Sequence, residues 1–279
     1  QEKIITKSYK KVNMRRLKVF KSLVRDSLDT MTSGSRKYNI WMGFLTFVML
    51  VGMYCYSVQL EHGLSVTGMS DRVSWGLYIS NFTFLVGVAA AAVMLVMPTY
   101  VLKDIDFKQA VLIGEGLAVA ALIMCLAFVV ADMGGPSVLW HMIPGIGVFN
   151  FPNSMLTWDV IVLNGYLFLN ISIPFYILFR RYQGKVPNPK IYVPGAILSV
   201  LWAVAIHLVT AFLYQGLQAR PFWNNALLGP RFLASAFAAG PALIILVLAI
   251  IRTYTEFKIK TKTINKIAMI VAVAAQINI

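Results

Sequence analysis

Seven long apolar segments dominate this sequence and restrict the class of fold that it can adopt. They cover residues 41–60, 75–97, 110–132, 156–179, 191–214, 232–251 and 264–279. A bilayer core about 30 Å thick needs roughly 20 apolar residues in a helix. Strand patterns are absent, and backbone groups in lipid must be hydrogen-bonded within their own segment. The sequence therefore predicts an all-α, polytopic bundle with at least seven transmembrane helices, and we expect the natural chain to continue beyond Ile279.

The composition supports this fold class and excludes several kinds of site. The chain is 58% hydrophobic and 13% charged, whereas ordinary globular domains carry about 25% charged residues. Its two cysteines, Cys55 and Cys125, both lie in apolar runs, so we expect no zinc site and no iron–sulfur cluster in this chain. Only His207 lies well inside a predicted helix, so we also expect no haem.

The distribution of basic residues predicts the orientation in the membrane. If the N-terminus is inside and the helices alternate, 22 of the 25 Lys and Arg residues fall on the inner side. This asymmetry is typical of cytoplasmic loops. We therefore expect a multi-pass protein of the cytoplasmic membrane with a cytoplasmic N-terminus. The net charge of +14 is explained by topology, and we expect no nucleic-acid partner.

The first 40 residues carry eleven Lys or Arg residues. Between residues 12 and 31, apolar side chains recur near helical spacing among the basic ones. This pattern is typical of an amphipathic helix that lies on the inner membrane surface. A disordered basic tail is the alternative that the sequence leaves open.

Polar and ionisable residues gather at the predicted outer ends of the helices. They are Tyr78, Asp132, Asp159, His207 and Arg220, together with His62 and His141 at or beyond helix ends. Such groups are expensive in a membrane, so we treat them as candidates for one outer binding site. Four of them also have a simpler explanation. Asp159 could complement a helix dipole, and His207 could bond a neighbouring helix. His62 could be a loop residue and Asp132 a helix-end residue.

One outer connection, residues 133–155, differs from the others. It has no Lys or Arg, and glycine and proline residues recur along it from Gly134 to Pro152. It is long for a link between two helices. We interpret it as a structured loop that covers the outer face and is available to a partner.

Several short motifs resemble the NrfD-type family of polysulfide-reductase membrane subunits. They are Trp75–Gly87, then Pro152, Ser154, Trp158 and Asp159, and then Arg220, Trp223, Pro230–Phe232 and Ser235–Gly240. Their order and spacing carry the resemblance, which extends from Tyr38 onward. The resemblance implies two four-helix bundles, with residues 41–179 forming the first, which holds a quinone site, and 180–279 the second, after a cytoplasmic segment 1–40.

The resemblance also implies a function, that of a menaquinone-interacting subunit in an electron-transfer complex like those of sulfate reducers. Expected partners are a ferredoxin-like iron–sulfur subunit on the outer face, a multihaem cytochrome c, a membrane cytochrome b and a cytoplasmic iron–sulfur subunit. We assign proton transfer to Asp159 and His207, with Arg220 tuning their pKa values. Secondary transport or a purely structural membrane anchor are the alternative functions.

Overall fold

The computed structural model describes residues 18–70, 72–73 and 75–278, and these residues are predominantly helical. The main helices are α2 (Arg36–His62), α3 (Leu77–Val96), α4 (Val111–Asp132), α5 (Met155–Tyr182), α6 (Pro189–Gln215), α7 (Leu228–Tyr254) and α8 (Thr261–Ile277). Within the described part, six helices are long and apolar enough to cross a membrane, namely α2 to α7. The predicted all-α, multi-pass fold is confirmed.

A further helix lies before α2. Residues 18–32 are helical, while positions 12–17 of the predicted amphipathic helix lie outside the described residues. The helix contacts the end of α5, where the Phe20 and Phe175 rings meet edge to face at 6.0 Å. The Tyr182 hydroxyl also donates to Asp26 Oδ2 at 2.6 Å. Residues 18–32 are therefore joined to the end of the bundle that the charge asymmetry predicts to be cytoplasmic.

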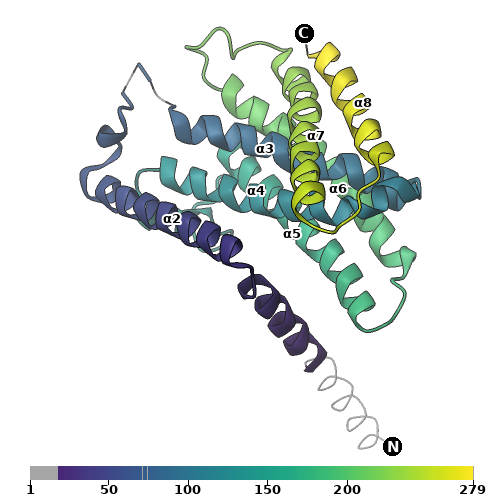
Figure 1. Cartoon of the computed structure of the whole chain (residues 1–279). Helices are drawn as coiled ribbons and strands as arrows, with labels where there is room; N and C mark the ends of the chain where they lie inside the picture. Colours follow the sequence, from purple (N-terminus) through teal and green to yellow (C-terminus); the bar gives the residue numbers. More distant parts are fainter. Residues whose placement is uncertain (1–17, 71, 74, 279) are drawn as a thin grey trace, which may run out of the picture.

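Helix α3 lies at the centre of the bundle, against α4, α6 and α7 (Figure 1). Small residues allow the closest of these contacts. Gly87 and Ala91 on α3 face Ala236 and Gly240 on α7, and a Cβ placed on Gly240 would lie 2.7 Å from the Gly87 carbonyl oxygen. Small residues at four-residue spacing let helix backbones approach in a membrane. This contact fixes the distance between α3 and α7.

Helix α2 lies at the side of the bundle (Figure 1), and its one buried residue is Gln59 near the C-terminal end. Gln59 Nε2 donates to the Ala131 carbonyl at 2.7 Å, and the Tyr78 hydroxyl donates to Gln59 Oε1 at 2.6 Å. Contacts of α3 with α7 and of α5 with α6 cross the expected boundary between 41–179 and 180–279. The division into two bundles stays a prediction.

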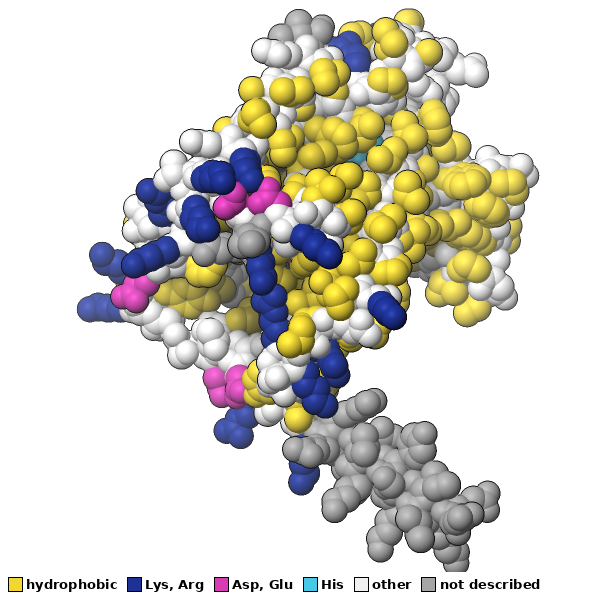
Figure 2. Space-filling view, turned by 90° about the vertical axis from the view of Figure 1, so that its right-hand side faces the viewer, with side chains coloured by type: hydrophobic (Ala, Val, Ile, Leu, Met, Phe, Trp, Pro, Cys, Tyr) yellow, Lys and Arg dark blue, Asp and Glu magenta, His cyan; other side chains and the backbone are white. Residues whose placement is uncertain are grey.

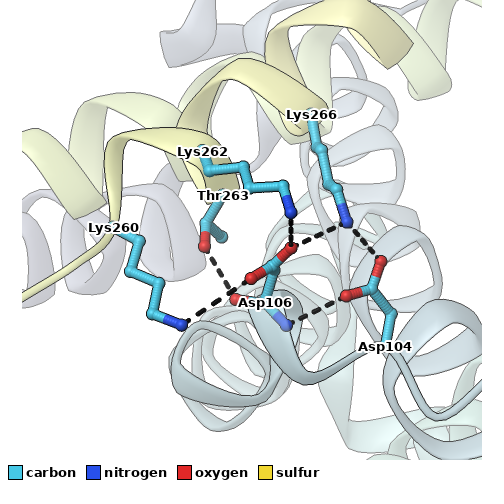
Figure 3. Close-up of polar contacts among 6 residues, drawn as sticks. All are labelled: Asp104, Asp106, Lys260, Lys262, Thr263 and Lys266. Carbon is cyan, nitrogen blue, oxygen red and sulfur yellow. Dashed lines mark hydrogen bonds and ion pairs between the residues drawn. The ribbon is translucent and has the colours of Figure 1, made fainter.

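An ion-pair network joins the α3–α4 connection to α8 (Figure 3). Lys266 Nζ lies 2.5 Å from Asp104 Oδ2 and 2.9 Å from Asp106 Oδ2, and Lys262 Nζ lies 3.1 Å from Asp106 Oδ2. Hydrogen bonds from Lys266 and Lys262 lower the pKa of Asp106 to about 2, so its carboxylate is charged at neutral pH. Figure 2 shows Lys and Arg side chains gathered at one end of the molecule, beside a wide hydrophobic surface.

Candidate functional site

A cavity of about 260 Å³ lies between α3, α6 and α7, toward the ends that the topology predicts to be outside. Its polar lining residues are Ser80, Thr83, His207, Thr210, Tyr214 and Ser235. Phe84 forms part of the wall and is 53% exposed, so the cavity adjoins the surface that faces lipid. A mostly apolar hollow with a few convergent polar groups is the usual form of a small-molecule site.

Helical spacing brings these residues to one level. Each of the three helices contributes residues at positions i, i+3 and i+7: 80, 83 and 87 on α3, 207, 210 and 214 on α6, and 232, 235 and 239 on α7. Positions with this spacing lie on one face of a helix. Thr83, Thr210 and Tyr214 were not among the residues predicted for the site. The spacing of Thr210 and Tyr214 from His207 is the signal that could have identified the last two.

His207 has one ring nitrogen free for a ligand. Its side chain is 2% exposed. Nδ1 lies 2.6 Å from the Ala203 carbonyl oxygen, and because a carbonyl only accepts, Nδ1 carries the hydrogen. In the neutral ring, Nε2 then has a lone pair, and it has no partner among the described residues. His207 can therefore accept a hydrogen bond, or a proton, from a molecule in the cavity.

The hydroxyl groups of Thr83, Thr210 and Tyr214 have already donated their hydrogens. Thr83 donates to the Ile79 carbonyl at 2.9 Å, and Thr210 donates to Ile206 at 2.8 Å. Since Thr83 has one hydrogen, Tyr214 is the donor in the 2.6 Å contact between their hydroxyl oxygens. Together with His207, these groups present acceptor atoms to the cavity.

Aromatic side chains cover the cavity on its predicted outer side. The Trp75 ring lies 4.9 Å from that of Tyr214 and stacks on Trp223 at 5.7 Å. Phe232 meets Tyr214 edge to face at 5.4 Å. These residues come from the stretch just before α3, the end of α6, the α6–α7 connection and α7. Trp75, Trp223 and Phe232 belong to the motifs that carry the family resemblance. The fold thus assembles separate motifs around one cavity.

Asp159 lies at the level of His207 but outside this cavity. Its side chain is 1% exposed, and Oδ1 has no partner among the described residues. Trp202 Nε1 donates to the Val162 carbonyl at 3.0 Å, which joins α5 to α6. Asp159 and His207 each lie about one turn beyond that bond, toward the predicted outer end. Asp159 is not among the described residues that line the cavity, so a role shared with His207 stays a prediction.

The structure spreads the remaining predicted residues over the same end of the bundle. Arg220 Nη2 donates to the Arg72 carbonyl, and the His141 ring stacks on Trp140 at 3.8 Å. His62 and Asp132 end α2 and α4. Tyr78 lines a separate cavity of about 280 Å³ beside Gln59. In the described structure, the His207 cavity is therefore lined by only one of the seven predicted residues.

No group of three or more His, Cys, Asp or Glu side chains in the described part of the chain could hold a metal ion. The lining of the His207 cavity, which combines apolar walls with a few polar groups, suits hydrogen bonding with a small amphiphilic molecule.

Comparison with known proteins identifies relatives over most of the chain. Residues 65–279 match the family described as "Polysulphide reductase, NrfD". A putative membrane subunit of a dimethyl sulfoxide reductase from Halobacterium salinarum is 24% identical over 232 residues, 78% of this chain and 52% of that protein. An Hdr-like menaquinol oxidoreductase integral membrane subunit of Archaeoglobus fulgidus is 25% identical over 228 residues, 82% and 54% of the two chains.

A selenate reductase subunit from Mesobacillus selenatarsenatis is 23% identical over 238 residues, which are 74% of this chain and 55% of that one. The chain thus spans about half the length of the curated relatives that it matches.

Proposed function

The chain belongs to the polysulphide reductase NrfD family, and on this premise we propose that it is a quinone-reactive membrane subunit of a respiratory oxidoreductase complex. The relatives support this proposal, because all three are named as subunits of reductases or of a menaquinol oxidoreductase. The observation that carries the proposal is the cavity with the unpaired Nε2 of His207 at the predicted outer end. We propose menaquinone as the ligand.

The cavity suits a quinone head group with its tail outside. Ligand pockets usually measure about 300–1,000 Å³, and this one, at about 260 Å³, has room for a ring system but not for an isoprenoid chain. The exposed Phe84 on its wall leaves the tail a place in the lipid. Two of its hydroxyl groups, those of Thr83 and Tyr214, meet between α3 and α6.

The acceptor atoms favour the reduced form of the ligand. A quinol has hydroxyl donors, whereas a quinone has only acceptors, so His207 Nε2 pairs with the quinol. When bound, menaquinol would supply two electrons and two protons. In this proposal His207 would accept one of these protons at Nε2 and become a cation that still donates through Nδ1 to Ala203. The Asp159 carboxylate, at the same level of the bundle, would accept the second proton. We therefore propose that the subunit oxidises quinol.

Electrons from the site would leave through an iron–sulfur partner on the outer face, over the connection 133–155. Part of that connection is ordered as the short helix η4 (Pro136–Met142), and Trp140, Ile143 and Ile146 are exposed on it. The proposed complex also includes a multihaem cytochrome c, a membrane cytochrome b and an iron–sulfur protein on the cytoplasmic side. The stretches Trp202–Tyr214 and Arg231–Pro241 further resemble DsrP, the membrane subunit of the sulfate-reduction complex, and we propose that role within the family.

His207→Gln in the assembled complex tests the proposal. Glutamine keeps a polar side chain but cannot accept a proton, so quinol-linked electron transfer should fall by about tenfold or more, equivalent to about 1.4 kcal/mol of activation free energy. His62→Gln is the matched control, because His62 is exposed at the end of α2. Unchanged quinol oxidation in an assembled His207→Gln complex would favour a purely structural anchor and refute the assignment.

A further inference from the structure

We propose that a second cavity, at the opposite end of the bundle, binds the phosphate group of an anionic phospholipid. The cavity measures about 310 Å³ and lies among the turn after α3, the start of α4, the end of α5 and the α5–α6 connection. This is the end that the charge asymmetry predicts to be cytoplasmic. The inference uses none of the residues of the proposed quinone site and stands independently of it.

The charges around this cavity sum to an excess of positive charge. Lys103, Lys108 and Arg181 line it, and Asp104 is the one acidic lining residue among the described ones. The Asp104 carboxylate is already paired with Lys266 Nζ at 2.5 Å, so it does not neutralise the lining cations (Figure 3). An anionic ligand would therefore meet three cations whose charge is not balanced within the cavity.

Neutral polar groups add hydrogen-bonding capacity to these cations. Thr99 Oγ1 is buried and has no partner among the described residues, so its hydroxyl is available to a phosphate oxygen. Tyr100 and Tyr192 also line the cavity, with their rings edge to face at 5.4 Å. The Tyr100 hydroxyl donates to Glu115 Oε2 at 3.0 Å. The Glu115 side chain itself is buried and is not among the described residues that line the cavity.

The apolar part of the lining favours a lipid over a free anion. Val111, Leu112 and Ile177 form one wall, and Val186, which is 85% exposed, stands at the rim. Figure 2 shows the Lys and Arg side chains of this end directly beside the hydrophobic surface. Basic pockets between helices on the cytoplasmic side attract anionic head groups, while the acyl chains remain in the leaflet. The cavity therefore offers cations for a phosphate group and an apolar wall for the adjoining part of the lipid.

Lipid binding to the purified full chain in detergent tests the proposal, with native mass spectrometry counting the bound molecules. The probes are phosphatidylglycerol, phosphatidylcholine and inorganic phosphate. We expect phosphatidylglycerol to bind about tenfold more tightly than phosphatidylcholine. The variant K103Q/K108Q/R181Q should lose this preference. The matched control K185Q/K190Q/K258Q removes the same charge from exposed lysines at the same end, outside the cavity lining, and should keep it.

Each outcome decides the matter. If inorganic phosphate displaces bound phosphatidylglycerol as strongly as added phosphatidylglycerol does, the phosphate site is supported. Its ligand is then a soluble phosphate, and the lipid assignment is refuted. If both triple variants lose binding equally, general surface charge explains the result and the site is refuted. The single variant K108Q, checked by its thermal unfolding in phosphatidylcholine, decides the case if the triple variant does not fold. Unchanged affinity in a folded K108Q would also refute the site.

Discussion

Among the described residues, two buried ionisable side chains carry a polar atom without a partner. The atoms are His207 Nε2 and Asp159 Oδ1, on side chains that are 2% and 1% exposed. An unpaired buried polar group costs about 1–3 kcal/mol, and ionisable groups inside a membrane mark function by default. Glu115 is equally buried but accepts from Tyr100 at 3.0 Å. His207 and Asp159 thus keep hydrogen-bonding capacity that no described residue uses.

At this scale, Asp159→Asn should leave assembly intact and slow quinol-linked electron transfer by about tenfold or more. Asparagine keeps the size and polarity of the side chain but removes its capacity to accept a proton. Rates of quinol oxidation by the assembled complex measure the effect. Glu61→Gln, which changes an exposed carboxyl at the end of α2, is the control. Full activity in the Asp159→Asn complex would make Asp159 a helix-end residue that complements the dipole of α5.

Among the elements, α3 and α7 form two walls of the His207 cavity and also make a very close contact. Gly87 lies on the cavity wall and opposite Ala236 at once. Small residues at the contact bring α3 and α7 together. On the same cavity, Thr83 of α3 meets Tyr214 of α6. Packing and site geometry are therefore coupled through the same helix face.

Gly240→Ala should lower the thermal unfolding midpoint of the full chain in detergent. The new methyl group would lie 2.7 Å from both Ala91 Cβ and the Gly87 carbonyl oxygen, so the backbones must separate. Overpacking of this kind costs about 1–3 kcal/mol. At Gly116 on α4, an added Cβ meets nothing within 4 Å, so Gly116→Ala should stabilise the helix by about 0.5–1 kcal/mol. Equal midpoints for the two variants would contradict the close contact.

Across the whole molecule, the two ends of the bundle differ in chemistry. One end carries the aromatic cover of Trp75, Trp223 and Phe232 over the His207 cavity. The other end carries the lysine–aspartate network and the basic cavity. Such polarity suits a protein that exchanges electrons on one side of a membrane and contacts anionic lipids on the other.

The charge asymmetry predicts the side on which each end lies. A cysteine placed at Lys185, in the α5–α6 connection, should be labelled by an impermeant thiol reagent only from the cytoplasm. A cysteine at Pro144, in the 133–155 connection, should be labelled only from outside. Both variants are made in a chain with Cys55 and Cys125 replaced by alanine, and that parent provides the background signal. Labelling of both positions from one side would contradict the predicted topology.

The positions of the helices could be predicted from the sequence alone. The predicted segment 156–179 is α5 (Met155–Tyr182) in the structure, and the other segments agree similarly. In lipid every backbone group must bond within its own helix, so apolar run length is sufficient to locate it. His207 and Asp159 could also be identified as candidates from the sequence, because ionisable side chains are rare within transmembrane helices.

Only the tertiary structure decided which side chains meet. The contact of Thr83 with Tyr214 joins residues 131 positions apart, and nothing local specifies it. The side position of α2, and the separation of Asp159 from the His207 cavity, were likewise not predictable. Lipid and neighbouring helices are equally apolar, so hydropathy does not distinguish a face that binds lipid from one that binds a helix. Close packing at small residues such as Gly87 and Gly240 makes that choice.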